Sequence, residues 1–127
     1  MTKTRITRVE SWVNLGIPDC ILALPDGLAL AELKIGSSTG RVKLSPHQIA
    51  FHEAHRAHAC FVLVEIGEGR KRTVAVYQAR EVRALSVGEA RPAGVFSCSV
   101  AGLSVLEGWL NSRVSTDFAN QKNDAIV

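Results

Sequence analysis

The stretch 15-LGIPDCILALPDGLALAELKIGSSTGRVKLSPHQ-48 decides the fold, because it holds two apolar runs, the turn between them and the start of a helix. The apolar runs are Cys20 to Leu24 and Leu28 to Ile35, and both have strand length. Pro25-Asp26-Gly27 between them is a turn signal, since proline fixes φ and glycine accepts a positive φ. The stretch therefore predicts a β-hairpin.

Three charged residues lie in this hairpin: Asp19, Glu32 and Lys34. Residues two apart on a strand share a face, so Glu32 and Lys34 point the same way, about 6.6 Å apart. If the turn has two residues, Leu24 pairs with Gly27 and Asp19 lies opposite Glu32, with about 4.5–5.5 Å between their Cβ atoms. A three-residue bulged turn would shift the register by one residue and separate the carboxylates. The sequence leaves both turns open.

Two buried carboxylates at that distance repel each other unless a cation lies between them. Mg²⁺ is typically held by one or two carboxylates together with water and substrate phosphate. A neighbouring lysine such as Lys34 can orient or deprotonate the attacking water, or stabilise developing charge. The residue types and spacing thus match metal-assisted phosphodiester hydrolysis. The alternative is a surface hairpin whose exposed charges contribute little.

Periodicity and capping signals predict the other elements. Ile6, Val9 and Val13 have helical spacing and Gly16 suits a helix stop, so we expect an amphipathic helix over 3–14. Ser45 opens a second helix with a capping box and should extend it to about residue 57. We also expect a short strand over 41–44, strands over 61–66, 73–77 and 95–100, and helices over 79–85 and 103–111.

This order predicts an α/β or α+β fold with a central mixed β-sheet flanked by helices. We expect a single domain over 1–114 and a polar C-terminal tail over 115–127 that is frayed. The chain has 127 residues, which suits one domain.

Composition narrows the class of protein. No apolar run approaches the roughly 20 residues needed to cross a bilayer, so we expect no membrane association, and the N-terminus lacks the apolar core of a secretory signal. Cys20, Cys60 and Cys98 are distant from one another and indicate free thiols in a reducing, cytoplasmic compartment. No phosphate-binding glycine motif is present, so we expect no nucleotide cofactor. The 15 basic residues exceed the 12 acidic ones, a balance that does not identify a nucleic-acid binder by itself.

GIPD, then ELK, then LSPHQ resembles the PD-(D/E)XK nuclease superfamily, and within it the small VRR-NUC and Holliday-junction-resolvase-like nucleases, phage-encoded ones included. The resemblance covers roughly Glu10 to Ile66. It implies a restriction-endonuclease-like core of order α-β-β-β-α-β and Mg²⁺- or Mn²⁺-dependent endonucleolytic cleavage of DNA, with branched or junction DNA among the candidate substrates. It also implies the cytoplasm of a bacterial cell or of a phage-infected host.

The resemblance assigns roles to individual residues. Asp19 and Glu32 would be metal ligands together with the backbone carbonyl of Leu33, and Lys34 would be the catalytic lysine. Glu10 would help to hold the metal or orient its water from the first helix. Gln48 would approach the scissile phosphate, although the capping box alone also accounts for a glutamine there.

DNA is the expected partner, and basic or polar residues near the hairpin are candidates for binding its phosphates. These candidates are Arg41, Lys43, Ser45, His47, Arg70, Lys71 and Arg72. Ordinary solvated loop charges explain each cluster equally well. A homodimer would suit paired cuts across a junction, with residues 95–109 either as its interface or as part of the core.

Other patterns are weaker. His47, His52, His55 and His58 gather on one predicted helix without a cysteine or carboxylate at ligand spacing, which favours residues flanking a DNA face or the surface over a zinc site. Trp12 and Trp109 are expected in the core or at an interface. The alternative functions are a non-catalytic nucleic-acid-binding module that keeps the nuclease fold, and a metal-dependent hydrolase of small phosphates.

Overall fold

A computed structural model describes residues 4–9, 16–36, 42–87, 96–99 and 103–126, and in these ranges the side chains of residues 70, 86, 87, 103 and 117–126 are left undescribed. The described strands form one mixed sheet in the order β1-β2-β3-β4-β5-β6. The elements are β1 (Arg5–Arg8), β2 (Cys20–Leu24), β3 (Gly27–Ile35), α1 (Pro46–Ala54), β4 (Cys60–Ile66), the 3₁₀ turn η1 (Gly69–Lys71), β5 (Thr73–Gln78), α2 (Ala79–Val87), β6 (Phe96–Ser99) and α3 (Leu103–Ile126). The predicted mixed sheet flanked by helices is confirmed, as an α+β fold.

The hairpin that opens the sequence argument is β2–β3, and its register is the one given by a two-residue turn. Leu24 pairs with Gly27 and Cys20 pairs with Ala31. Gly27 has a φ of +155°, which a residue with a side chain rarely adopts. One step beyond the last pair, Asp19 therefore faces Glu32.

β3 and β4 are parallel neighbours, and α1 lies in the crossover between them. Ser45 caps α1 with a complete capping box and Pro46 fills its first turn, as the sequence predicts. The helix ends at Ala54, three residues earlier than expected. The crossover brings the N-terminus of α1 beside the charged end of the hairpin.

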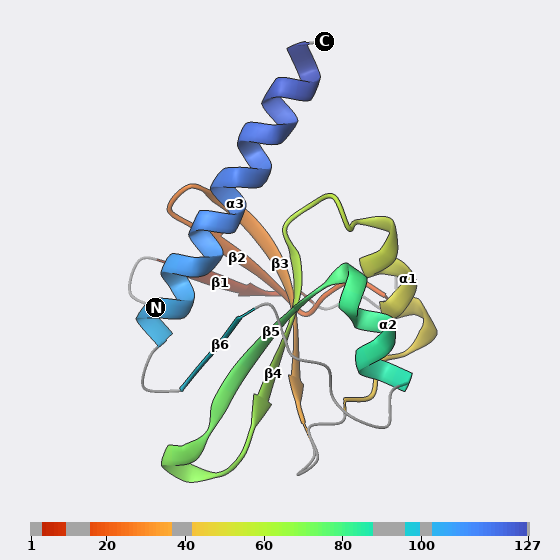
Figure 1. Cartoon of the computed structure of the whole chain (residues 1–127), viewed down its shortest axis with the longest axis vertical. Helices are drawn as coiled ribbons and strands as arrows, with labels where there is room; N and C mark the ends of the chain where they lie inside the picture. Colours follow the sequence, from red (N-terminus) through yellow and green to blue (C-terminus); the bar gives the residue numbers. More distant parts are fainter. Residues whose placement is uncertain (1–3, 10–15, 37–41, 88–95, 100–102, 127) are drawn as a thin grey trace.

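Three layers make up the molecule, with the sheet between α3 on one side and α1 and α2 on the other (Figure 1). Alternation along β4 supplies both faces, since Phe61 and Leu63 belong to the core under α3 while Val62 and Val64 belong to the core under α1 and α2. Leu110 of α3 is fully buried in the first of these cores.

Several expectations are wrong in detail. Residues 5–8 form the edge strand β1 rather than part of a helix, because pairing with β2 outweighs a weak helical pattern. Consequently the first helix of the expected α-β-β-β-α-β core is not found in this part of the chain. Residues 42–44 form no strand, although Val42 and Leu44 are buried. α3 continues to Ile126, so the segment 115–126 that we expected as a frayed tail is helical.

Candidate active site

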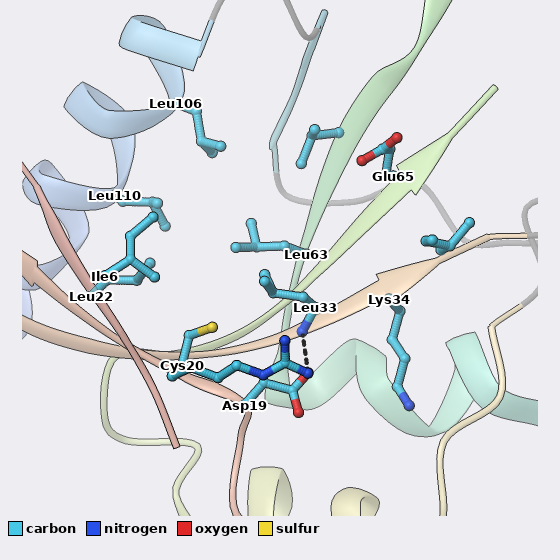
Figure 2. A pocket seen from close by; sticks show the side chains of 13 residues that line it. Ile6, Asp19, Cys20, Leu22, Leu33, Lys34, Leu63, Glu65, Leu106 and Leu110 are labelled. Carbon is cyan, nitrogen blue, oxygen red and sulfur yellow. Dashed lines mark hydrogen bonds between the residues drawn. The ribbon is translucent and has the colours of Figure 1, made fainter. Parts of the chain in front are cut away.

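Asp19 and Glu32 meet across the hairpin at the end of β2 that precedes Cys20. Glu32 Oε2 accepts a hydrogen bond from the backbone nitrogen of Asp19 at 3.2 Å. In return, Asp19 Oδ2 accepts one from the backbone nitrogen of Leu33 at 3.2 Å (Figure 2). Each carboxylate is thus tied to the backbone of the other strand, which fixes the positions of both.

Glu32 is almost completely buried, with 2% of its surface exposed. Its other oxygen, Oε1, accepts a hydrogen bond from Gln48 Nε2 at 2.9 Å and lies 3.7 Å from the Lys34 ammonium nitrogen. Burial is the main cause that raises the pKa of Glu32 to about 7, and the Asp19 carboxylate raises it further while Lys34 opposes the rise. A buried acid beside a second acid is therefore held close to the point of protonation near neutral pH.

Gln48 completes the capping box and also contacts Glu32. Its backbone nitrogen donates to the Ser45 hydroxyl and its Oε1 accepts from the Ser45 backbone nitrogen, which completes the capping box. The Nε2 atom of the same side chain donates to Glu32 Oε1. The helix cap therefore aims the glutamine at the carboxylate, and the same contacts serve both stability and the site.

A divalent cation fits this pair of carboxylates. In the described part of the chain no three or more His, Cys, Asp or Glu side chains gather in a way that could hold a metal ion. Mg²⁺ does not need such a group, because one or two carboxylates with water and phosphate are its usual set. Burial and the neighbouring Asp19 carboxylate raise the pKa of Glu32, and a cation bound by both carboxylates would oppose that rise. Asp19 and Glu32 would hold the ion.

Gly16 allows the chain to reach this place, a role that the sequence argument missed. A Cβ atom at Gly16 would collide with the backbone oxygen of His47 in the first turn of α1. The sequence pattern alone predicts a helix stop at this glycine. The close approach instead lets residues 16–18 pass the start of α1 and deliver Asp19 opposite Glu32.

A largely apolar cavity of about 540 Å³ borders the site on the α3 side of the sheet. Figure 2 shows Leu33, Leu63 and Leu110 around it, with Asp19 and Lys34 at its margin. Arg8 of β1 also lines the cavity, opposite Cys20 in the strand register. Arg8 and Asp19 therefore line the same cavity. The sequence analysis did not identify Arg8 as a candidate, because it predicted a helix for this segment.

The expected DNA-binding residues divide into two groups. Lys43, Ser45 and His47 lie just before or in the first turn of α1, where Gln48 reaches Glu32, and Lys43 and His47 are exposed. Lys71 and Arg72 lie past the far end of β4. Because Glu32 pairs with Val62, the end of β4 at Ile66 is roughly 13 Å from the acidic pair along the strand.

Arg72 already has partners within the chain, since its guanidinium donates to Glu65 at 2.9 Å and to the Gly69 carbonyl at 3.0 Å. The structure therefore separates Lys71 and Arg72 from the acidic pair and brings Ser45 and His47 close to it. Glu10 and Arg41 lie outside the described residues, as does the side chain of Arg70. Their expected roles, like that of the Leu33 carbonyl, stay predictions.

The histidines and tryptophans differ in their surroundings. His52 is fully buried rather than at a surface, and neither of its ring nitrogens has a hydrogen-bond partner among the described residues. Burial lowers the pKa of His52 to about 4, so its ring is neutral at pH 7. Trp109 packs on the core as expected, stacked on Phe96 with ring centroids 5.1 Å apart. Trp12 is outside the described residues.

The cysteines agree with the expectation of free thiols: Cys20 and Cys60 are buried, and Cys98 is half-buried. Among the helices that the structure describes, none is long and apolar enough to cross a membrane. Comparisons with protein-family models, with curated proteins and with solved structures found no match to this chain.

Proposed function

We propose that this protein is a divalent-metal-dependent DNA endonuclease of the PD-(D/E)XK type, with branched or junction DNA among its candidate substrates. The observation that carries the proposal is the position of Glu32, a buried carboxylate opposite Asp19 that contacts both Lys34 and Gln48. A domain that only had to fold would gain by replacing this charge with an apolar residue. A buried carboxylate beside a second acid and a lysine is instead typical of a site that binds a cation and performs chemistry.

Mg²⁺ or Mn²⁺ held by Asp19 and Glu32 would polarise the phosphate and lower the pKa of a bound water. Lys34, whose ammonium lies 3.7 Å from Glu32, would orient the attacking water or stabilise the charge that develops on the phosphate. Gln48 would act as a positioning residue, because its hydrogen bond fixes the carboxylate of Glu32.

The surroundings of the acidic pair are also suited to a polyanion. Arg8 lines the neighbouring cavity, and the exposed His47 and Lys43 flank the start of α1. The first turn of a helix attracts anions through its backbone N–H groups and its dipole. These residues support DNA as the substrate, and the free cysteines support action in the reducing cytoplasm.

Cleavage of a labelled four-way junction, beside the matched duplex and single strand, tests the proposal with Mg²⁺, Mn²⁺ or EDTA. We expect metal-dependent cutting by the wild type, and complete loss with retained DNA binding in Lys34→Ala. Arg5→Ala is a matched control, since it removes one positive charge from an exposed position of β1 that is not among the candidates for DNA binding. Loss of binding with retained cleavage in Lys34→Ala would overturn the assignment.

An absence of cutting by folded wild type would favour the non-catalytic nucleic-acid-binding module, and calorimetry with Mg²⁺ or Mn²⁺ then separates the two classes. A binding module has no need of the ion, whereas a nuclease that lacks its correct DNA substrate still binds it. Cutting of mononucleotide substrates without cutting of DNA would indicate a hydrolase of small phosphates.

A further inference from the structure

Three arginines from three different parts of the chain line one pocket of about 380 Å³. Arg56 follows the end of α1, Arg80 is the second residue of α2, and Arg113 lies on α3. None of the three was a candidate in the sequence analysis, because they are distant from one another in the sequence. Only the packing of the helices around the sheet brings them together.

Among the side chains that the structure describes, no carboxylate forms an ion pair with these arginines. The acidic residues are absent from the described lining of the pocket, and none of the described ion pairs includes these arginines. Glu53, which interacts electrostatically with Arg56, is itself held by two hydrogen bonds to Arg83. Within the described residues, the pocket therefore collects positive charge without a matching anion in its lining.

The position of Arg80 makes this arrangement less favourable still. It lies in the first turn of α2, where the helix dipole is positive and a cation is destabilising. Glu81 offsets part of this effect, since its Oε1 accepts a hydrogen bond from the backbone nitrogen of Gln78 at 3.1 Å. An anion that binds between like charges at the positive end of a helix relieves their repulsion and so stabilises the folded protein.

Arg113 is held in a fixed direction. In the amide orientation that satisfies both groups, the side-chain oxygen of Gln78 accepts from Arg113 Nη2 at 2.7 Å and from Nε at 3.3 Å. Its guanidinium carbon also lies 5.8 Å from the centre of the Trp109 ring. An arginine positioned in this way loses less conformational entropy when it binds a further acceptor.

We propose that this pocket binds a phosphate group, with the phosphodiester of a DNA strand as its source. Guanidinium groups are the residues best matched to phosphate oxygens, because each presents parallel N–H donors. The pocket is separate from the acidic pair, since α1 rises roughly 9 Å over the six residues from Gln48 to its end at Ala54. That separation corresponds to about three base pairs of duplex. The inference rests on the DNA-binding part of the proposed function and is independent of cleavage.

The test measures DNA affinity against salt concentration in EDTA, by fluorescence anisotropy with a labelled duplex. Arg80→Gln, Arg113→Gln and the double variant are compared with the wild type. If the arginines share one phosphate, each single variant lowers the slope of log K against log salt by up to about 0.9, and the double variant lowers it by no more than that. Additive losses would indicate separate contacts with scattered phosphates and would overturn the pocket.

Arg5→Gln is the matched control, because it removes one charge from the exposed strand β1 outside the pocket. An equal fall of the slope in Arg5→Gln and Arg80→Gln would show a general charge effect and refute the proposal. Arg80→Lys should recover part of the lost affinity, and thermal melts of each variant verify that it is folded.

Inorganic phosphate separates the two sources of the ligand. If millimolar phosphate raises the melting temperature of the wild type but not of Arg80→Gln, while the DNA slope is unchanged, the pocket takes a free phosphate and the DNA source is overturned. If neither DNA affinity nor phosphate stabilisation depends on the arginines, the pocket is no phosphate site. If the arginine variants lower the salt slope as expected but the wild type cuts no DNA, the phosphate pocket is supported and only the proposed nuclease activity is rejected.

Discussion

Replacing Glu32 by glutamine should make the metal-free protein more stable at alkaline pH and less stable at acid pH. Glutamine keeps the shape of the side chain and resembles the protonated acid, but it cannot ionise. Glu32 is 2% exposed, and burial together with Asp19 raises its pKa to about 7. The folded state therefore holds this proton more tightly than the unfolded chain does. The stability that the raised pKa of Glu32 contributes is complete below about pH 4.5 and is lost as the pH rises through about 7.

The size of the effect follows from the pKa and the hydrogen bonds. A rise from 4.5 to about 7 corresponds to about 3 kcal/mol of unfolding free energy, at about 1.4 kcal/mol per unit. Glutamine can accept from Gln48 or from the Asp19 backbone nitrogen with its one oxygen, so it loses one acceptor and about 1 kcal/mol. Glu32→Gln should thus be about 2 kcal/mol more stable than the wild type at pH 8.5. It should be about 1 kcal/mol less stable at pH 4, with the two curves crossing near pH 5.

Urea unfolding with EDTA, monitored from pH 4 to pH 8.5, measures this difference. Glu65→Gln is the control, since the Glu65 carboxylate is 40% exposed and its stability difference should not change sign. A difference between Glu32→Gln and the wild type that stays constant with pH would refute the reasoning from burial. Addition of Mg²⁺ at pH 8.5 should raise the stability of the wild type and leave Glu32→Gln unchanged.

Three further variants test other parts of the structure. His52, with a folded pKa of about 4 against 6.5 when free, should cost the protein about 3 kcal/mol as the pH falls from about 6.5 to 4. Glu32 has the opposite effect on the pH dependence of stability, so this loss is measured by urea unfolding in the Glu32→Gln background, with and without His52→Phe. If His52→Phe does not change how the unfolding free energy falls at acid pH, the expectation is contradicted. Ser45→Ala should lose about 1 kcal/mol in urea unfolding and reduce cleavage, because the cap also aims Gln48; equal stability would show that the capping box is dispensable. Gly16→Ala should lose about 1–3 kcal/mol and lower metal affinity in calorimetry, since its Cβ meets the His47 backbone; unchanged affinity would separate this glycine from the site.

The acidic pair was predictable because all the information that positions it is local. The turn between Leu24 and Gly27 sets the register, and the register sets Asp19 opposite Glu32. The sequence left two turns open, and the structure selects the two-residue one. Gln48 was predictable as a cap, whereas its contact with Glu32 depends on how the crossover helix packs on the sheet.

Other features were beyond the sequence because they depend on packing between distant segments. Ile6 and Val9 suggested a helix, but strand pairing with β2 decided the outcome for residues 5–8 and brought Arg8 to the cavity. His52 looked like a surface residue among other histidines, and only the packing of α1 shows it to be buried without a partner. Local periodicity is too weak to predict such tertiary effects.

The sequence by itself determined the hairpin, the capped helix after it, and the residue types of the acidic pair, because turn chemistry, capping and strand alternation act over a few residues. The tertiary structure alone decided the burial of Glu32 and the meeting of Arg56, Arg80 and Arg113 at one pocket. Elements distant in the chain set both features, since they bury Glu32 and so raise its pKa, and they bring the three arginines to one pocket whose described lining holds no carboxylate.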